Sequence, residues 1–195
     1  MALHLNKKKL VAAAAVPAAL LASGGLVWSA SYSAFSATTS NPTNNWTAGT
    51  VALSDNDSET ALFTATNLKP GATAARCITV TSSGSLASTV KLYGTDYATT
   101  NNLAANLNLK VEEGSGSTGA DCAGFTAAGS AIFDGTLTSF ATTKTSFATG
   151  AGTWAPAAGT QTKSYRVTYA LSANTPDSAQ GGTARVGLTW EAQNS

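Results

Sequence analysis

Histidine is almost absent from this chain of 195 residues: its single histidine, His4, lies among the first ten residues. Ser-His-Asp and Cys-His nucleophile systems, and H-E-x-x-H zinc proteases, all need histidines in the body of the protein. The G-x-S-x-G elbow, the phosphate-binding Walker loop and the glycine fingerprint for dinucleotides are missing as well. The sequence therefore predicts a protein that is not an enzyme, with no catalytic or metal-binding residues and no cofactor.

Charged residues are scarce too. They make up 11% of the chain, against roughly 25% in an average soluble domain. The net charge of +1 provides no basic footprint for nucleic acid, so no such partner is expected. Thr, Ser, Ala, Gly and Asn fill the gap, and small polar and β-branched residues favour strands and turns over helices.

Long apolar runs are confined to the N-terminus. A basic head, residues 1–9, precedes the apolar run 10–28, and small residues follow at 29–34. This is the order of a secretory signal peptide, and no later stretch approaches the ~20 apolar residues of a membrane span. We expect a secreted or cell-surface protein that touches the membrane only through this segment. An uncleaved anchor stays open as the alternative, because the apolar run is long enough for one.

The pattern after residue 45 is that of short β-strands. Residues 34–45 are rich in Ser, Thr and Asn and contain Pro42, which predicts a flexible N-terminal arm. From Trp46 onward, several runs alternate with a period of two, separated by turn residues. The predicted strands are 50–54, 61–67, 75–81, 89–94, 106–112, 131–136, 164–172 and 184–192. The fold class is therefore all-β: an antiparallel β-sandwich of jelly-roll type over 46–195, preceded by the signal-peptide helix, with short helices conceivable only at 102–109 and 136–148.

Only two cysteines occur, Cys77 and Cys122. An even number in an exported chain predicts one disulfide. On the chain-entropy model, closing a loop of this length stabilises the fold by roughly 3–4 kcal/mol. The bridge would attach the loop around Cys122 to the strand that carries Cys77. A redox-active or metal-binding pair would need C-x-x-C spacing or histidine partners, and neither is present.

Two acidic groups are candidates for chemistry. Glu112 and Glu113 are adjacent in a predicted strand, so they point to opposite faces and cannot act on one bond; we interpret them as a solvated strand end. Residues 55–59 (D-N-D-S-E) place three carboxylates at alternate positions, as calcium loops do. The EF-hand glycine and final glutamate are replaced by Thr60 and Thr66, so a polar hairpin loop is the simpler interpretation.

A set of ordered motifs is similar to those of the TasA/camelysin family. The motifs are Gly24-Gly25 with Trp28, Ala34-Phe35-Ser36, W-T-A-G-T-V-A-L at 46–53, A-T-N-L-K-P-G at 65–71, S-S-G-S-L at 82–86 and G-L-T-W-E-A at 187–192. The resemblance implies a jelly-roll domain in an extracellular protein, often of the biofilm matrix and often fibre-forming. It also implies cleavage between Ser33 and Ala34 by a SipW-type signal peptidase, with Ser31 and Ser33 as recognition residues and 1–33 as the signal peptide.

The predicted function is that of a secreted structural protein of the cell surface or biofilm matrix. Sheet edges can accept an added strand, so we expect the arm to pair with a neighbouring subunit and form filaments, with Phe35 and Trp46 as its large apolar residues. One alternative is a monomeric adhesin or carbohydrate-binding module, in which Trp154, Tyr97 or Trp46 would stack on sugars. A camelysin-like surface metalloprotease is the other, for which the chain after His4 offers no histidine.

Overall fold

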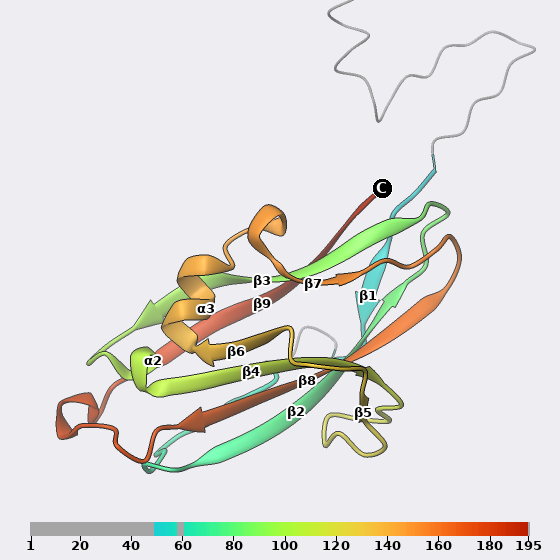
Figure 1. Cartoon of the computed structure of the whole chain (residues 1–195). Helices are drawn as coiled ribbons and strands as arrows, with labels where there is room; N and C mark the ends of the chain where they lie inside the picture. Colours follow the sequence, from blue (N-terminus) through green and yellow to red (C-terminus); the bar gives the residue numbers. More distant parts are fainter. Residues whose placement is uncertain (1–48, 58–60, 195) are drawn as a thin grey trace, which may run out of the picture. The chain divides into compact units, whose positions relative to one another are not determined.

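The computed structural model describes residues 49–57 and 61–194, which form an all-β sandwich of two antiparallel sheets (Figure 1). The six-stranded sheet has the order β1-β2-β8-β4-β5, and β6 also pairs with β4. Its strands are β1 (Leu53–Asp55), β2 (Thr73–Ser82), β4 (Leu107–Ser115), β5 (Thr126–Ala127), β6 (Phe133–Thr136) and β8 (Gln161–Leu171). The three-stranded sheet has the order β7-β3-β9, with β7 (Ala151–Trp154), β3 (Ser88–Thr99) and β9 (Ala184–Asn194). The predicted fold class is thus confirmed, while the predicted signal-peptide helix lies outside the described residues.

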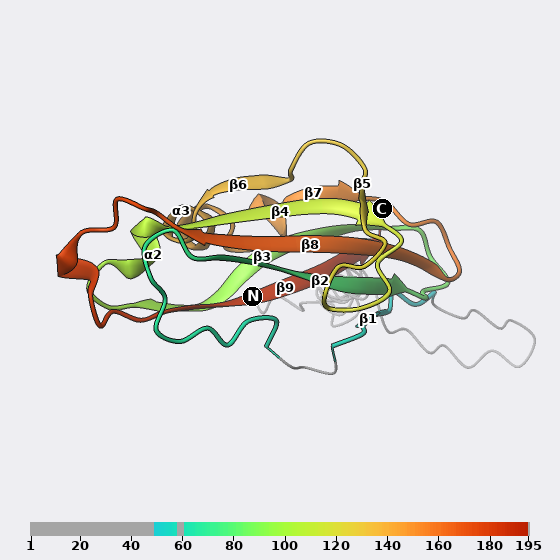
Figure 2. The same cartoon turned by 90° about the horizontal axis from the view of Figure 1, so that it is seen from below.

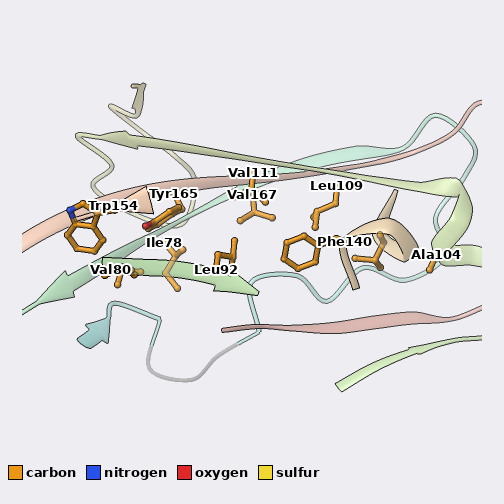
Figure 3. Close-up of a cluster of buried hydrophobic side chains, with 12 residues drawn as sticks. Ile78, Val80, Leu92, Ala104, Leu109, Val111, Phe140, Trp154, Tyr165 and Val167 are labelled. Carbon is orange, nitrogen blue, oxygen red and sulfur yellow. The ribbon is translucent and has the colours of Figure 1, made fainter. Parts of the chain in front are cut away.

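Alternating side chains of the two sheets form the core. Val111 of β4 and Val167 of β8 are fully buried, and they face Leu92 of β3 across the sandwich (Figure 3). The period of two that predicted these strands arises because one face of each strand is buried and the other is not. In Figure 1 the strands β7, β3 and β9 lie as one layer above β4, β8 and β2, and in the view from below the two sheets overlap (Figure 2).

Short helices connect the strands at both places that the sequence left open. They are α2 (Leu103–Asn106) and α3 (Leu137–Thr143), and the 3₁₀ turns η1 (Phe147–Thr149) and η2 (Asp177–Ala179) lie elsewhere in the connections. The Thr136 hydroxyl caps α3 by accepting a hydrogen bond from the amide of Ser139 at 3.1 Å. The helix inserts Phe140 fully into the core, where its ring makes an edge contact with Phe133 at 4.9 Å.

One predicted strand is absent. Residues 61–67 were expected to form a strand, but they are irregular, and in the described part of the chain they pair with neither sheet. Their apolar residues Leu62 and Phe63 pack against the core as side chains without a ladder. Conversely, the two-residue β5 and the four-residue β7 were not predicted, because such short runs carry too little alternation to be detected.

Candidate functional site

The last strand, β9, forms an open edge. It runs for 11 residues and pairs with β3 from Asn194 opposite Ser88 to Ala184 opposite Thr99. Across the residues that the structure describes, no strand pairs with its other side. The remaining outer strands, β1, β5, β6 and β7, have only two to four residues each. The main site for adding a further strand is therefore β9.

The hydrogen-bonding direction of β9 follows from its partner. The Gly94 amide donates to the Lys144 carbonyl at 2.8 Å, so Gly94 points its backbone groups away from β9. In an antiparallel ladder the residue opposite, Leu188, then points its own amide and carbonyl away from β3. Because the direction alternates, Trp190 and Ala192 do the same. Their side chains meanwhile belong to the row that packs against the core.

An apolar cavity of about 1110 Å³ lies between the sheets beside this edge. Its walls come from β4 and β8 of the large sheet, from β9, and from the irregular segment 61–70. The apolar side chains that the sheets contribute include Leu109, Val167, Tyr169, Val186, Leu188 and Trp190. A strand added to β9 would project alternate side chains into this space.

The segment 61–70 covers one side of the cavity. Phe63 makes an edge contact with the ring of Tyr169, with 5.1 Å between the centroids. The segment ends in a turn, in which the Ala72 amide donates to the Lys69 carbonyl at 2.9 Å, and the Gly71 amide donates to the Leu171 carbonyl at 2.9 Å. The segment is thus fixed at its C-terminal end by backbone hydrogen bonds and further back by side-chain packing.

The outer edge of β2, in contrast, is closed. The Cys77 amide donates to the Ala120 carbonyl at 3.1 Å, and the Thr79 amide donates to the Asn56 side-chain oxygen at 2.9 Å. Beyond them, β1 pairs with β2 from Val80 to Ser82. These contacts use the amides that an incoming strand would need.

The predicted disulfide is present and fixes the loop that closes this edge. Cys77 and Cys122 are bonded with 4.9 Å between their Cα atoms, and Cys77 is only 2% exposed. The loop 116–125 connects β4 to β5, and it reaches β2 through this bond. Phe125, in the same loop, lies over the guanidinium of Arg166 at 4.8 Å.

Glu112 is not the solvated strand end that the sequence suggested. It is 7% exposed and binds Arg166 and Lys110 on the outer face of the large sheet, at 2.8 and 3.0 Å. Burial raises the pKa of Glu112, but the hydrogen bonds and positive charges of the two cations outweigh it, so the pKa lies below the usual 4.5. The prediction failed because β4 is an inner strand of the sheet.

Glu113 points to the opposite face, as its position in the strand predicts. One of its carboxylate oxygens is buried without a hydrogen-bond partner among the described residues. It fits beside Gly152, whose φ is +80° and where a Cβ atom would lie 2.5 Å from this oxygen. Burial raises the pKa of Glu113, although the positive charge of Lys163 opposes the shift. Burial, helped by the Glu113 carboxylate, also raises the pKa of Tyr165.

A comparison with protein families matches residues 6–111, more than half of the chain, to the family described as camelysin metallo-endopeptidase. The chain belongs to the camelysin family. The match extends from the N-terminal segment through β3 into β4. A comparison with curated proteins found no match.

The name of the camelysin family implies a metal-dependent peptidase, which would require a cluster of metal-binding side chains. Within residues 49–57 and 61–194, no three His, Cys, Asp or Glu side chains lie close enough together to hold a metal ion. Both thiols are consumed by the disulfide, and Glu112 is paired with two cations. The described residues do not fit a catalytic metal.

The residues considered for sugar stacking or calcium binding lie in different environments. Trp154 is 8% exposed and belongs to the core, which corrects the idea that it could stack on a sugar. Tyr97 is part-buried, and its hydroxyl hydrogen-bonds Thr138 at 3.0 Å. In the acidic loop, the Asp57 amide donates to the Asp55 carboxylate at 3.2 Å, an arrangement typical of a turn.

The predicted cleavage and arm residues lie outside the described part of the chain, as does one carboxylate of the acidic loop. They are Ser31, Ser33, Ala34, Phe35, Trp46 and Glu59. None of the helices within 49–57 and 61–194 combines the length and apolarity of a membrane span.

Proposed function

We propose that this camelysin-family protein is a secreted structural subunit of the cell surface or biofilm matrix, and that it assembles by adding a strand to β9. The observation that carries the proposal is the 11-residue open edge beside an apolar cavity. Unpaired amides and carbonyls along such an edge are a template for another chain. Main-chain hydrogen bonds would supply affinity, and alternate side chains entering the cavity would supply specificity.

The arm 34–45 is the segment that we propose as the added strand. Its 12 residues would extend over roughly 40 Å, while the 11 residues of β9 span roughly 37 Å. Phe35 and Trp46 at its two ends are suited to apolar space in or beside the cavity. Pro42 has no amide to donate, which an edge position tolerates. Addition to a neighbouring subunit is a head-to-tail contact, which generates filaments unless it closes into a ring.

The first described residues of the domain, Gly49 and Thr50, include an anchoring point. The Thr50 amide donates to the Ser85 hydroxyl at 2.8 Å, and the Leu86 amide donates to the Thr50 carbonyl at 3.2 Å. The chain around Ser85 is the connection between β2 and β3, near Ser88, which lies opposite the C-terminal end of β9. The chain that follows the arm is therefore fixed at Thr50 in each subunit, which favours a regular repeat.

The alternative functions have less support. An adhesin that used Trp154 or Tyr97 would have to bind sugars through a buried indole and a ring whose hydroxyl is already engaged. A metalloprotease would need a metal site, and the described side chains do not fit one. We therefore propose a role that is structural and not catalytic.

Removing the arm tests the proposal. A chain that starts at Ala34 is compared with one that starts at Trp46, by light scattering and by electron microscopy over days at neutral and acidic pH. We expect filaments only from the longer chain, at a rate that rises with concentration. If both chains stay monomeric, or both polymerise equally, the arm is not the assembly element. An arm that pairs with its own β9 would leave the longer chain monomeric at every concentration.

A further inference from the structure

We propose that the segment 61–68 is an internal cap, which covers one side of the acceptor cavity of the single subunit and must move aside before a strand can be added to β9. This inference rests on the proposed function and names its regulation. It follows from the position of the segment, from the way it is held, and from its sequence.

The cap and the incoming strand meet at the same side of the cavity. Leu62, Phe63 and Leu68 line the cavity together with Leu188 and Trp190 of β9. A strand paired with β9 would lie about 4.8 Å from it and would direct alternate side chains into that cavity. Because the two sheets form the walls on the other sides, the cap covers the side at which the added strand would enter.

The cap is held weakly. In the described part of the chain no backbone hydrogen bond joins residues 61–68 to either sheet, and the nearest ones begin at Lys69 and Gly71. The specific contact of the cap is the edge packing of Phe63 on Tyr169. The added arm would bring the ring of Phe35 together with a ladder of hydrogen bonds that the cap lacks, so it has the means to displace the cap.

The cap has the sequence pattern of a β-strand, but within the described residues it pairs with no other strand. Residues 61–67 (A-L-F-T-A-T-N) were predicted to be a strand, yet they remain irregular beside an open edge. Leu62 and Phe63 keep the cavity partly covered in the subunit before assembly. A cap of this kind would delay assembly until another subunit's arm is present at sufficient concentration.

The test compares the secreted protein, purified from the medium, with Phe63→Ala and with Phe125→Ala. Phe125 is a matched control because its ring packs on Arg166 on the outer face of the large sheet and not in the cavity. We expect Phe63→Ala to assemble about tenfold faster by light scattering, since the loss of a part-buried aromatic contact favours release of the cap. Phe125→Ala should assemble at the wild-type rate. Circular dichroism confirms that each variant is folded, and Phe63→Leu, with an intermediate rate, replaces Phe63→Ala if that variant is not.

A second measurement uses chymotrypsin cleavage after Phe63. Cleavage should be faster in the assembled state than in the single subunit, because the released cap is exposed. A folded Phe63 variant that assembles no faster than wild type, or cleavage that is no faster after assembly, overturns the cap and leaves strand addition intact. If neither the wild type nor any variant assembles, the proposed function fails and the cap fails with it.

Discussion

Arg166 and Glu112 lie directly opposite each other on β8 and β4, and the Arg166 Nε donates to Oε2 of Glu112 at 2.8 Å. Cys77 of β2 continues the same row on the outer face, since it is the register partner of Arg166. The loop 116–125 is attached along this row, by the disulfide at Cys77 and by Phe125 stacked on Arg166. A disulfide and a cation–π contact thus hold one loop at two neighbouring strands, and the ion pair with Glu112 positions the guanidinium of that contact.

Replacing Glu112 by Gln should lower the free energy of unfolding at pH 7 by about 1–3 kcal/mol, because charged hydrogen bonds to Arg166 and Lys110 are lost. The pKa of Glu112 is lowered in the folded state. The contribution of Glu112 to the free energy of unfolding is therefore present above the pKa of the unfolded state, and it disappears as the pH falls through the pKa of the folded state. Urea denaturation between pH 3 and about pH 7 should show the two proteins converging in acid. The exposed Asp134→Asn is the control, and a gap of constant size at all pH values would contradict the prediction.

Replacing Glu113 by Gln should have the opposite effect. Burial raises the pKa of Glu113 in the folded state. The protonated carboxyl group therefore contributes to the stability of the fold below the pKa of the unfolded state, and this contribution is lost as the pH rises through the pKa of the folded state. Glu113→Gln should therefore raise the thermal midpoint at pH 7 by about 2–4 °C. At low pH the variant and the wild type should unfold at the same temperature. A lower midpoint for the variant at neutral pH would show that the ionised carboxylate is stabilising.

Reducing the disulfide should lower the free energy of unfolding by roughly 3–4 kcal/mol, since the bond closes a loop between residues 45 positions apart. Urea denaturation with and without reductant measures this difference, and a Cys77→Ala/Cys122→Ala protein should not respond to reductant. Mass spectrometry of the freshly secreted protein should find it two hydrogens lighter than the reduced form. Two free thiols in that protein would rule out the bond in the native state.

Ala192→Pro should abolish assembly while changing the stability of the subunit by less than about 1 kcal/mol. The amide of Ala192 points away from β3, so proline removes a donor from the open edge and none from the β3 ladder. Thr189→Pro is the matched control, because the Thr189 amide points toward β3 and its loss should destabilise the subunit itself. Light scattering and thermal unfolding report the two effects separately. Normal filaments from Ala192→Pro would show that β9 does not accept the strand.

The purified secreted protein should not cleave casein. This expectation rests on the missing histidines after His4 and on the lack of a metal cluster within the described residues. The assay is run with added zinc and with a chelator, beside a known metalloprotease as the positive control. Robust turnover that the chelator abolishes would overturn the structural role in favour of an enzymatic one.

The parts of the fold that the sequence predicted are those with a strong local pattern. β8 and β9 alternate apolar and polar residues along most of their length, since one face of β8 is buried and one face of β9 packs, part-buried, against the core. The two cysteines could be paired by count alone. The burial of Glu112 was not predictable, because Arg166 is 54 residues away and becomes its neighbour only through the register of β4 with β8.

The candidate site was predicted only in outline. The sequence suggested that a sheet edge would accept a strand, but the order β7-β3-β9, which leaves β9 at the edge, depends on long-range pairing. Residues 61–67 show the same limit of prediction from a local sequence pattern. Alternation there indicated a strand, but a strand also needs a partner, and a local pattern does not specify one.

The loop that the disulfide holds against β2 limits the number of strands that one subunit can accept. With the amides of Cys77 and Thr79 already bonded, the described part of the large sheet has no long free edge on this side, and among the described strands β9 is left as the one long acceptor. One acceptor and one arm per molecule allow growth in threads and not in branched or two-dimensional arrays. A molecule without its arm can then still accept a strand at β9, but it has no strand to donate to the next subunit. A small proportion of such molecules would therefore terminate growing filaments and shorten them.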